Sequence, residues 1–196
     1  MKTDRKHQII KKAGKLFSKS GYHKITMRDI ADSCGITEAA LYKHFDSKDA
    51  IYTAVLHSIK AKISPGKLFD SLQDKQDIDA ILFDLAKFIS SLYEKHQDFL
   101  RLLLYSSLEG HSMAKEIYNS LRLPFIKFLA GKIQELIKAD KVVKVNPQLT
   151  ARCFVGMAFD CALNFKLWKG MAGKVFSQEA TMQNNVSIFV RGLAKA

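Results

Sequence analysis

The sequence predicts an all-α protein, and three observations carry that prediction. Apolar residues recur at helical spacing through nearly all of the 196 residues. The 3 Pro and 10 Gly are too few for a loop-rich or sandwich fold. The best strand candidate, Val142–Val145, is short and stands alone. A hydrophobic content of 47% and a charged content of 26% are those of an ordinary soluble globular protein.

The first two helices have clear start and stop signals. Apolar residues from Ile9 to Phe17 form the core face of the first helix, and Gly21 supplies its stop. Thr26 is a good N-cap for a short helix over 26–33, and Asp29 completes a capping box with it.

A tight connection and two more helices follow. Gly35 marks the connection, and Thr37 caps a short helix that runs to about residue 44. Asp46 and Asp49 match a further capping box, which we expect to open a helix that ends at Ser64-Pro65-Gly66.

Five more helices are expected in the remainder, which makes about nine in all. Pro124 should kink or divide the long helix 113–139. Asn146 and Pro147 are a cap and first residue for a helix that stops at Gly170. The others cover 78–92, 99–105, which we expect to be buried, and the segment that Ser177 caps.

Charge points to an anionic partner. The net charge is +12, from 31 Lys and Arg against 19 Asp and Glu. Residues 1–60 hold 12 basic and 6 acidic residues, and the other 136 hold 19 and 13. The positive charge density is therefore about twice as high in the first block, where a nucleic-acid surface should be sought.

Compartment and membrane association follow from composition. Cys34, Cys153 and Cys161 are an odd number and lie far apart, so no disulfide framework is expected. The first residues lack the apolar stretch of a signal peptide. The most apolar run, 153–165, is too short to span a bilayer and contains Asp160. We expect a cytoplasmic protein that does not associate with a membrane.

Residues 26–45 have the layout of a helix-turn-helix, two short helices joined by a tight turn. Ala31 is small enough for the helices to cross closely, and Ile30, Ile36 and Leu41 can form the core between them. The second helix of such a motif lies in the major groove of DNA.

The stretch from about residue 9 to residue 56 resembles the DNA-binding domain of the TetR family of ligand-responsive transcriptional regulators. The matching residues are Phe17, Gly21-Tyr22, Thr26, Arg28-Asp29-Ile30-Ala31, Gly35-Ile36-Thr37, Leu41-Tyr42-Lys43-His44-Phe45 and Lys48. The resemblance implies a helix-turn-helix domain at 1–47 and a helical ligand-binding and dimerisation domain at 48–196, with Lys48–Ile63 as the connecting helix.

Chemistry and the resemblance together assign the DNA contacts. Lys43 can reach a guanine edge or a phosphate, and Ala39 can touch a thymine methyl. Lys48 lies in a first helical turn, where the helix dipole attracts an anion. The full set is Thr26, Arg28, Thr37, Glu38, Ala39, Tyr42, Lys43, His44 and Lys48. The alternatives are capping alone for Thr26, simple packing for Tyr42, a solvated side chain for Arg28, Lys43 and Lys48, and a helix-start role for Glu38.

The second block is expected to dimerise and to bind a ligand. The resemblance implies a four-helix bundle between two subunits, with Phe154, Ala158, Phe165, Val186, Phe189 and Val190 as interface candidates. An apolar cavity is expected to be lined by Phe88, Tyr105, Glu109, Arg122, Phe125, Phe128, Met157 and Asn164. The alternative in both cases is that these residues belong to the core of one chain.

We therefore expect a sequence-specific regulator, a repressor that a small, mostly apolar molecule releases from a palindromic operator in double-stranded DNA. The alternative is a helical module that binds a protein or a membrane surface. Catalytic, metal-binding and cofactor motifs are absent from the sequence, so we expect neither an enzyme nor a cofactor or metal.

Overall fold

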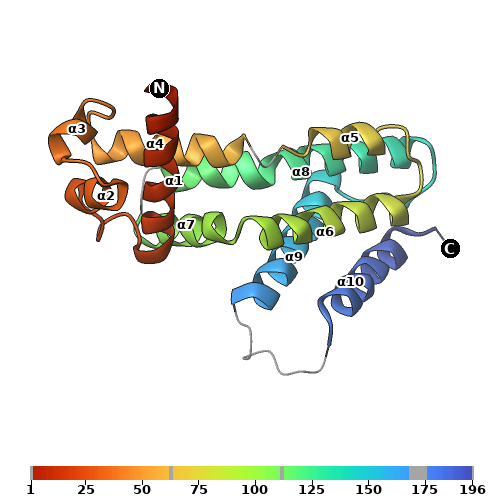
Figure 1. The fold of residues 1–196 in the computed structure, drawn as a ribbon. Helices are drawn as coiled ribbons and strands as arrows, with labels where there is room; N and C mark the ends of the chain where they lie inside the picture. Colours follow the sequence, from red (N-terminus) through yellow and green to blue (C-terminus); the bar gives the residue numbers. More distant parts are fainter. Residues whose placement is uncertain (1, 62–63, 111–112, 168–175, 196) are drawn as a thin grey trace. The chain divides into compact units, whose positions relative to one another are not determined.

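The computed structural model describes residues 2–61, 64–110, 113–167 and 176–195, which form ten α-helices and no strand (Figure 1). The predicted all-α class is confirmed. The helices are α1 (Lys2–Ser20), α2 (Met27–Cys34), α3 (Glu38–Tyr42), α4 (Lys48–Lys60), α5 (Gly66–Leu72), α6 (Ile78–Lys95), α7 (Gln97–Leu108), α8 (Met113–Lys138), α9 (Pro147–Leu167) and α10 (Gln178–Leu193).

The helix that the sequence did not predict is α5. Ser64-Pro65-Gly66 ends α4 as expected, but Pro65 then stands at the N-cap position of a new seven-residue helix. Leu72 at the end of α5 is fully buried, so tertiary packing stabilises a helix too short to signal itself by periodicity.

The chain divides into two compact units, each described here by itself. The first contains residues 1–64 and 96–120, and the second contains 65–95 and 121–196. The boundary predicted between residues 47 and 48 separates a DNA-binding domain from a ligand-binding and dimerisation domain. It does not coincide with the division into compact units, and it stays a prediction. The chain passes between the units at 64/65, 95/96 and 120/121, and the last of these points lies within α8, about one turn before Pro124.

In the first unit, α1 packs against α2, α4 and α7. Its core holds residues with no exposed surface from four helices, namely Ile9, Phe17, Ile30, Leu41 and Ile51. Tyr52 is also buried, and its hydroxyl pairs with the hydroxyl of Ser106 on α7.

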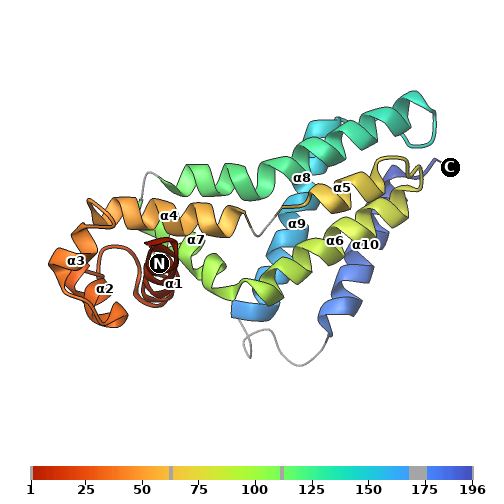
Figure 2. The ribbon, with the colours of Figure 1, turned by 45° about the horizontal axis from the view of Figure 1, so that its top comes forward.

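In the second unit, α6, α9 and α10 pack against one another (Figure 2). Among the described residues of this unit, one charged side chain is buried. Lys132 on α8 is 2% exposed, and its Nζ donates to the Gln73 carbonyl at 2.5 Å and to Glu135 Oε2 at 2.8 Å. Gln73 is the C-cap residue of α5, so Lys132 fastens the end of that helix to α8.

Most predicted helix signals are confirmed. Thr26 and Thr37 cap α2 and α3 with their side chains. Asn146 Oδ1 accepts from Leu149 N at 3.0 Å at the start of α9. Gly21 ends α1 with a φ of 81°. The predicted stop at Gly170 lies outside the described residues.

Two local predictions need correction. The N-cap of α4 is Ser47, whose hydroxyl accepts from Ala50 N at 3.1 Å, so the Asp46–Asp49 capping box is wrong. Asp49 instead accepts a hydrogen bond from Tyr22 Oη at 2.7 Å, a tertiary contact that the sequence did not reveal. At Pro124 the expected division is wrong, because α8 runs through this residue from Met113 to Lys138; the alternative, a kink, stays a prediction.

None of the described helices is long and apolar enough to cross a bilayer.

Candidate nucleic-acid interface

The turn between α2 and α3 has the geometry that a helix-turn-helix requires. Gly35 adopts the left-handed conformation at φ 65° and ψ 38°, and its N–H donates to the carbonyls of Ala31 and Asp32. Ile36 N also donates to the Ala31 carbonyl, at 3.1 Å. A left-handed residue at this point ends α2 and redirects the chain within two residues, which sets the crossing of α3 over α2.

The start of α2 is fixed by a reciprocal capping box. Asp29 N donates to Thr26 Oγ1 at 3.1 Å, and Thr26 N donates to Asp29 Oδ2 at 2.8 Å. The Thr26 hydroxyl donates to the same carboxylate oxygen at 2.6 Å. These hydrogen bonds from the side chain and backbone of Thr26 lower the pKa of Asp29.

Helix α3 separates a buried side from an exposed side. Leu41 has no exposed surface, and Phe45, just after the helix, is nearly buried. The exposed side carries Glu38, Ala39, Tyr42 and Lys43, and Tyr42 is 49% exposed. Positions i, i+1, i+4 and i+5 share one helical face, so four of the predicted DNA contacts lie together on one exposed surface.

The remaining contacts predicted on α2 and α3 lie around that surface. Thr37 is exposed at the N-cap of α3, where its Oγ1 accepts from Ala40 N at 3.2 Å. Thr26 and Arg28 are exposed at the start of α2, and His44 is half-buried after α3. Their contacts with DNA stay predictions, as do those of the four residues on α3.

Lys48 is the first residue of α4, as predicted, and it is held by contacts within the first unit. Its side chain is half-buried, and its Nζ donates to the carbonyls of Tyr22 and Ile25 at 3.0 and 2.9 Å. The ammonium also lies 4.1 Å from the centroid of the Tyr22 ring. In this structure Lys48 fastens the α1–α2 loop to the start of α4, and its contact with DNA stays a prediction.

Tyr22 is a packing and hydrogen-bonding residue of the first unit to which sequence reasoning gave no role. Its ring stacks with that of Phe17 at 5.9 Å and meets the edge of the Tyr52 ring at 5.0 Å. Burial, followed by the hydrogen bond to the Asp49 carboxylate, raises the pKa of Tyr22 far above its ordinary value. Tyr22 is part of the Gly21-Tyr22 pair that contributes to the family resemblance. Its partners Asp49 and Tyr52 are distant in sequence, so no sequence pattern indicated these contacts.

Helix α7 holds the C-terminal end of α1. Arg101 Nε donates to the Ser18 carbonyl at 3.0 Å, and Tyr105 Oη donates to the Lys19 carbonyl at 3.4 Å. Glu109 Oε2 accepts from Tyr22 N at 3.0 Å. Three side chains at successive turns of one helix face therefore satisfy backbone groups around the turn at Gly21.

Tyr105 and Glu109 were predicted as ligand contacts. In the structure both side chains form hydrogen bonds with backbone groups of the first unit. The other predicted pocket residues belong to the second unit. There Phe125 is buried, with its ring centroid 5.9 Å from Phe88 and 6.0 Å from Phe159. The Arg122 guanidinium lies 4.8 Å from the Phe159 ring. Phe69 on α5 stacks on Phe128 at 4.4 Å, which extends the aromatic cluster.

The last two pocket candidates are half-buried on α9. Met157 Sδ lies 3.8 Å from Cys161 Sγ, and Asn164 Nδ2 donates to Asp160 Oδ2 at 2.8 Å. Their contact with a ligand stays a prediction.

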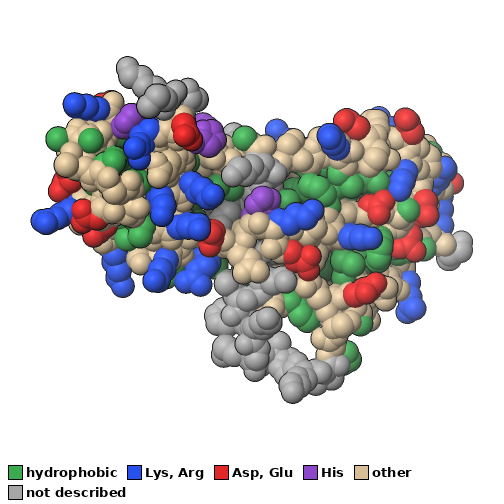
Figure 3. Space-filling model, in the orientation of Figure 1, with side chains coloured by type: hydrophobic (Ala, Val, Ile, Leu, Met, Phe, Trp, Pro, Cys, Tyr) green, Lys and Arg blue, Asp and Glu red, His purple; other side chains and the backbone are tan. Residues whose placement is uncertain are grey.

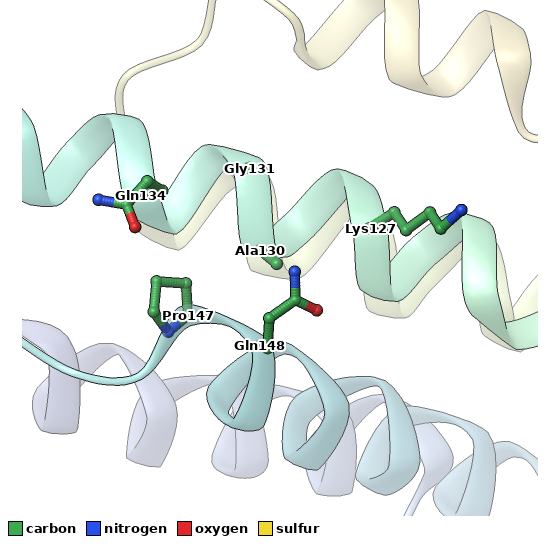
Figure 4. A pocket seen from close by; sticks show the side chains of 6 residues that line it. All are labelled: Lys127, Ala130, Gly131, Gln134, Pro147 and Gln148. Carbon is green, nitrogen blue, oxygen red and sulfur yellow. The ribbon is translucent and has the colours of Figure 1, made fainter.

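A surface groove of about 420 Å³ lies elsewhere in the second unit, between α8 and the start of α9 (Figure 4). Its lining residues are Lys127, Ala130, Gly131, Gln134, Pro147 and Gln148. None of them is a predicted ligand contact, and the groove is open to solvent.

The dimer candidates on α9 and α10 divide by burial. Phe154, Ala158 and Val186 are buried within the chain. Phe154 meets the edge of the Phe189 ring at 5.2 Å, so α9 and α10 pack on each other through these side chains. Phe165, Phe189 and Val190 are half-buried. Their presence in a dimer interface stays a prediction.

Two capped helices, a left-handed glycine turn and an exposed polar face on the second helix define a helix-turn-helix DNA-binding protein. Residues 9–55 match the family model described as "Bacterial regulatory proteins, tetR family". Residues 9–55 therefore carry a DNA-binding domain of the TetR type, and the relatives that the chain resembles are named transcriptional regulators.

Named relatives agree with this family. The chain is 24% identical to the HTH-type transcriptional regulator YhgD of Bacillus subtilis over 168 residues, 82% of this chain and 85% of YhgD. It is 31% identical to IcaR of Staphylococcus aureus, the negative transcriptional regulator of the biofilm operon icaADBC, over 117 residues. That match covers 60% of this chain and 61% of IcaR.

The fold is shared with solved structures along the whole chain. A transcriptional regulator from Saccharomonospora viridis, in complex with choline, superposes with a TM-score of 0.75 at 17% identity. The alignment covers 99% of this chain and 100% of that one.

Proposed function

We propose that the protein is a cytoplasmic homodimeric repressor that binds a palindromic operator and is released by a small, mostly apolar molecule. The observation that carries the DNA-binding part is the exposed face of α3, where Glu38, Ala39, Tyr42 and Lys43 lie together while Leu41 is buried. A helix whose polar side chains are kept out of the core is available to the major groove.

The residue types on this face suit base reading. Lys43 supplies a cation for a guanine edge or a phosphate, and the Ala39 methyl group fits against a thymine methyl. Tyr42 supplies a hydroxyl for a phosphate oxygen, and Thr37 borders the groove at the start of the helix. Glu38 has a favourable position in the first turn of α3, where the helix dipole attracts its carboxylate.

Two considerations support a dimeric repressor. One five-residue helix contacts only a few base pairs, and two copies related by a two-fold axis read a palindrome. IcaR, 31% identical over 117 residues, is named a negative regulator, which favours repression over activation.

Release by a ligand is supported by chemistry in the second unit. The rings of Phe69, Phe88, Phe125 and Phe128 form a cluster in which an apolar molecule would find aromatic contacts. The Saccharomonospora viridis regulator of the same fold binds a small molecule, choline. A ligand changes operator affinity only if it binds two conformations of the protein with different affinity.

The test is fluorescence anisotropy with labelled duplexes tiled across the DNA upstream of the protein's own gene. We expect one site bound at least ~10³-fold more tightly than a scrambled duplex, with two protomers per site. Equal, weak binding to all duplexes would contradict the proposal and favour a helical interaction module. Once the site is known, small apolar molecules can be screened for release, measured as a fall in anisotropy.

A further inference from the structure

The net positive charge of residues 1–60 lies on α1. Residues 21–60, which contain the whole helix-turn-helix, hold five Lys or Arg and five Asp or Glu, a net charge of zero. Helix α1 holds seven Lys or Arg and a single Asp, a net charge of +6. The segment that contains the helix-turn-helix therefore carries no net charge, and α1 beside it carries half of the chain's +12.

The cationic side chains of α1 form a stripe on its exposed face. Arg5, Lys12 and Lys19 recur every seven residues, and Lys15 stands between the last two on the same side. All four are exposed. The buried residues Ile9, Ala13 and Phe17 form a separate strip that adjoins this stripe on the helix surface. The blue side chains gathered over α1 in Figure 3 show this concentration.

The lysines of this stripe are not engaged inside the protein. Within the described residues, the ammonium groups of Lys12, Lys15 and Lys19 form no hydrogen bond and no ion pair. In contrast, Lys48 and Lys132 are each held by at least two acceptors within the chain. Uncompensated like charges on one helix face repel one another, so an anionic partner would relieve them.

The N-terminal end of α1 lies beside the predicted recognition helix. Lys6 Nζ is 5.5 Å from the centroid of the Phe45 ring, and Phe45 comes three residues after α3 ends. Both helices belong to the first unit, in which α1 packs on α2. Phe45 lies on the buried side of α3, so this contact places the N-terminal end of α1 one helix diameter, roughly 10–12 Å, from the exposed face that would meet a duplex.

We propose that the exposed face of α1 binds the phosphates of duplex DNA next to the bases that α3 reads. The proposal rests on DNA binding by α3. The stripe from Arg5 to Lys19 spans 14 residues, about 21 Å at 1.5 Å per residue. B-DNA rises 3.4 Å per phosphate on each strand, so the stripe matches about six base pairs of backbone. Because it meets phosphates alone, this surface adds affinity without sequence preference.

The experiment measures how salt changes the affinity for a mixed-sequence duplex of about 40 base pairs, several times the length of the stripe. The test variant is Lys12→Gln/Lys15→Gln/Lys19→Gln in the full chain, since glutamine keeps the helix propensity. The matched control is Lys67→Gln/Lys87→Gln/Lys138→Gln, which removes the same charge from exposed positions on α5, α6 and α8. Circular dichroism checks that each variant keeps its helical content.

We expect the slope of log affinity against log salt to become shallower by between about 1 and 3 in the test variant, because each lost phosphate contact removes about 0.9. The control should leave the slope unchanged, and Lys12→Gln alone should reduce it by no more than about 1. A test variant with the wild-type slope, or a control with an equal change, would overturn the proposal.

The two proposals fail in different ways. If the wild type binds operator and mixed-sequence duplexes equally, sequence-specific regulation fails, but the slopes still test α1. If the test variant keeps its operator preference while its slope becomes shallower, both proposals stand, because the lost contacts carry no sequence information.

Discussion

The contact between α7 and the turn after α1 can be tested at Gly21. A Cβ added at this glycine would lie 2.4 Å from Glu109 Oε1, closer than side chains approach. The Gly21→Ala substitution must therefore displace the carboxylate that accepts from Tyr22 N. It must also hold an alanine at a φ of 81°, in the left-handed region.

The Gly35→Ala substitution separates the two costs. Gly35 has a similar φ of 65°, but an added Cβ there would meet no atom within 4 Å. Gly35→Ala should lower the free energy of unfolding by about 1–2 kcal/mol, the cost of the left-handed conformation. Gly21→Ala should cost about 1.5–3 kcal/mol more, the worth of a hydrogen bond to a charged group. Because Glu109 is only half-buried, the lower end of that range is expected.

Urea unfolding followed by circular dichroism at pH 7 measures these differences. In a Glu109→Ala background the extra cost of Gly21→Ala should disappear, leaving a penalty like that of Gly35→Ala. If Gly21→Ala costs the same with and without the Glu109 carboxylate, the two residues are not coupled and the assignment of α7 to this turn is wrong.

Three further predictions concern single contacts, each measured by urea unfolding. Tyr52→Phe removes a buried hydroxyl–hydroxyl hydrogen bond between α4 and α7 and should lower the free energy of unfolding by about 1 kcal/mol; no change would contradict this. Thr26→Ala should destabilise the protein at pH 7. Because the folded state lowers the pKa of Asp29, its contribution is present above the unfolded pKa of about 3.9 and is lost as pH falls. The difference between wild type and Thr26→Ala should therefore shrink below about pH 4, and a difference independent of pH would count against the capping box. Lys132→Met keeps the buried stem but leaves the carbonyl at the end of α5 without its donor, at a cost of about 1–3 kcal/mol, whereas the exposed Lys67→Met should change stability by less than about 0.5 kcal/mol.

Local signals explain what the sequence could predict. Thr26, Thr37 and Asn146 cap their helices with hydrogen bonds that span three residues, so the information lies within one turn. Gly21 and Gly35 mark their turns because left-handed φ values strongly favour glycine. The buried and exposed sides of α3 follow from helical periodicity, since Leu41 and Phe45 are spaced by four residues.

Contacts between distant segments explain what the sequence could not predict. Lys48 has the spacing of a phosphate-binding residue, but two carbonyls about 25 residues earlier hold its ammonium. Glu109 was expected near a ligand because it is polar within a helical block. It binds Tyr22 N, 87 residues away. The start of α4 was mispredicted for two reasons. Ser47 and Asp46 are both good N-caps, and Ser47 is the one that caps the helix. Asp49 accepts a hydrogen bond from the hydroxyl of Tyr22, which is distant in sequence.

The same limit applies to the second unit. The aromatic residues from Phe88 to Phe159 are as suitable for a core as for a ligand cavity, because the same apolar surface serves both. The structure packs Phe125 between Phe88 and Phe159, as a core residue would be packed.

The central claim is that the exposed face of α3 reads DNA sequence, and Ala39→Glu tests it most directly. Ala39 is exposed in the middle of that face, so the glutamate should leave the fold intact and place bulk and negative charge against the base edges. Ala180→Glu makes the same change at an exposed position in the first turn of α10. Fluorescence anisotropy gives the ratio of affinities for operator and scrambled duplex. We predict that Ala39→Glu lowers this ratio by at least ~10-fold, about 1.4 kcal/mol, and that Ala180→Glu leaves it unchanged. An unchanged ratio in Ala39→Glu would contradict the claim that α3 lies in the major groove.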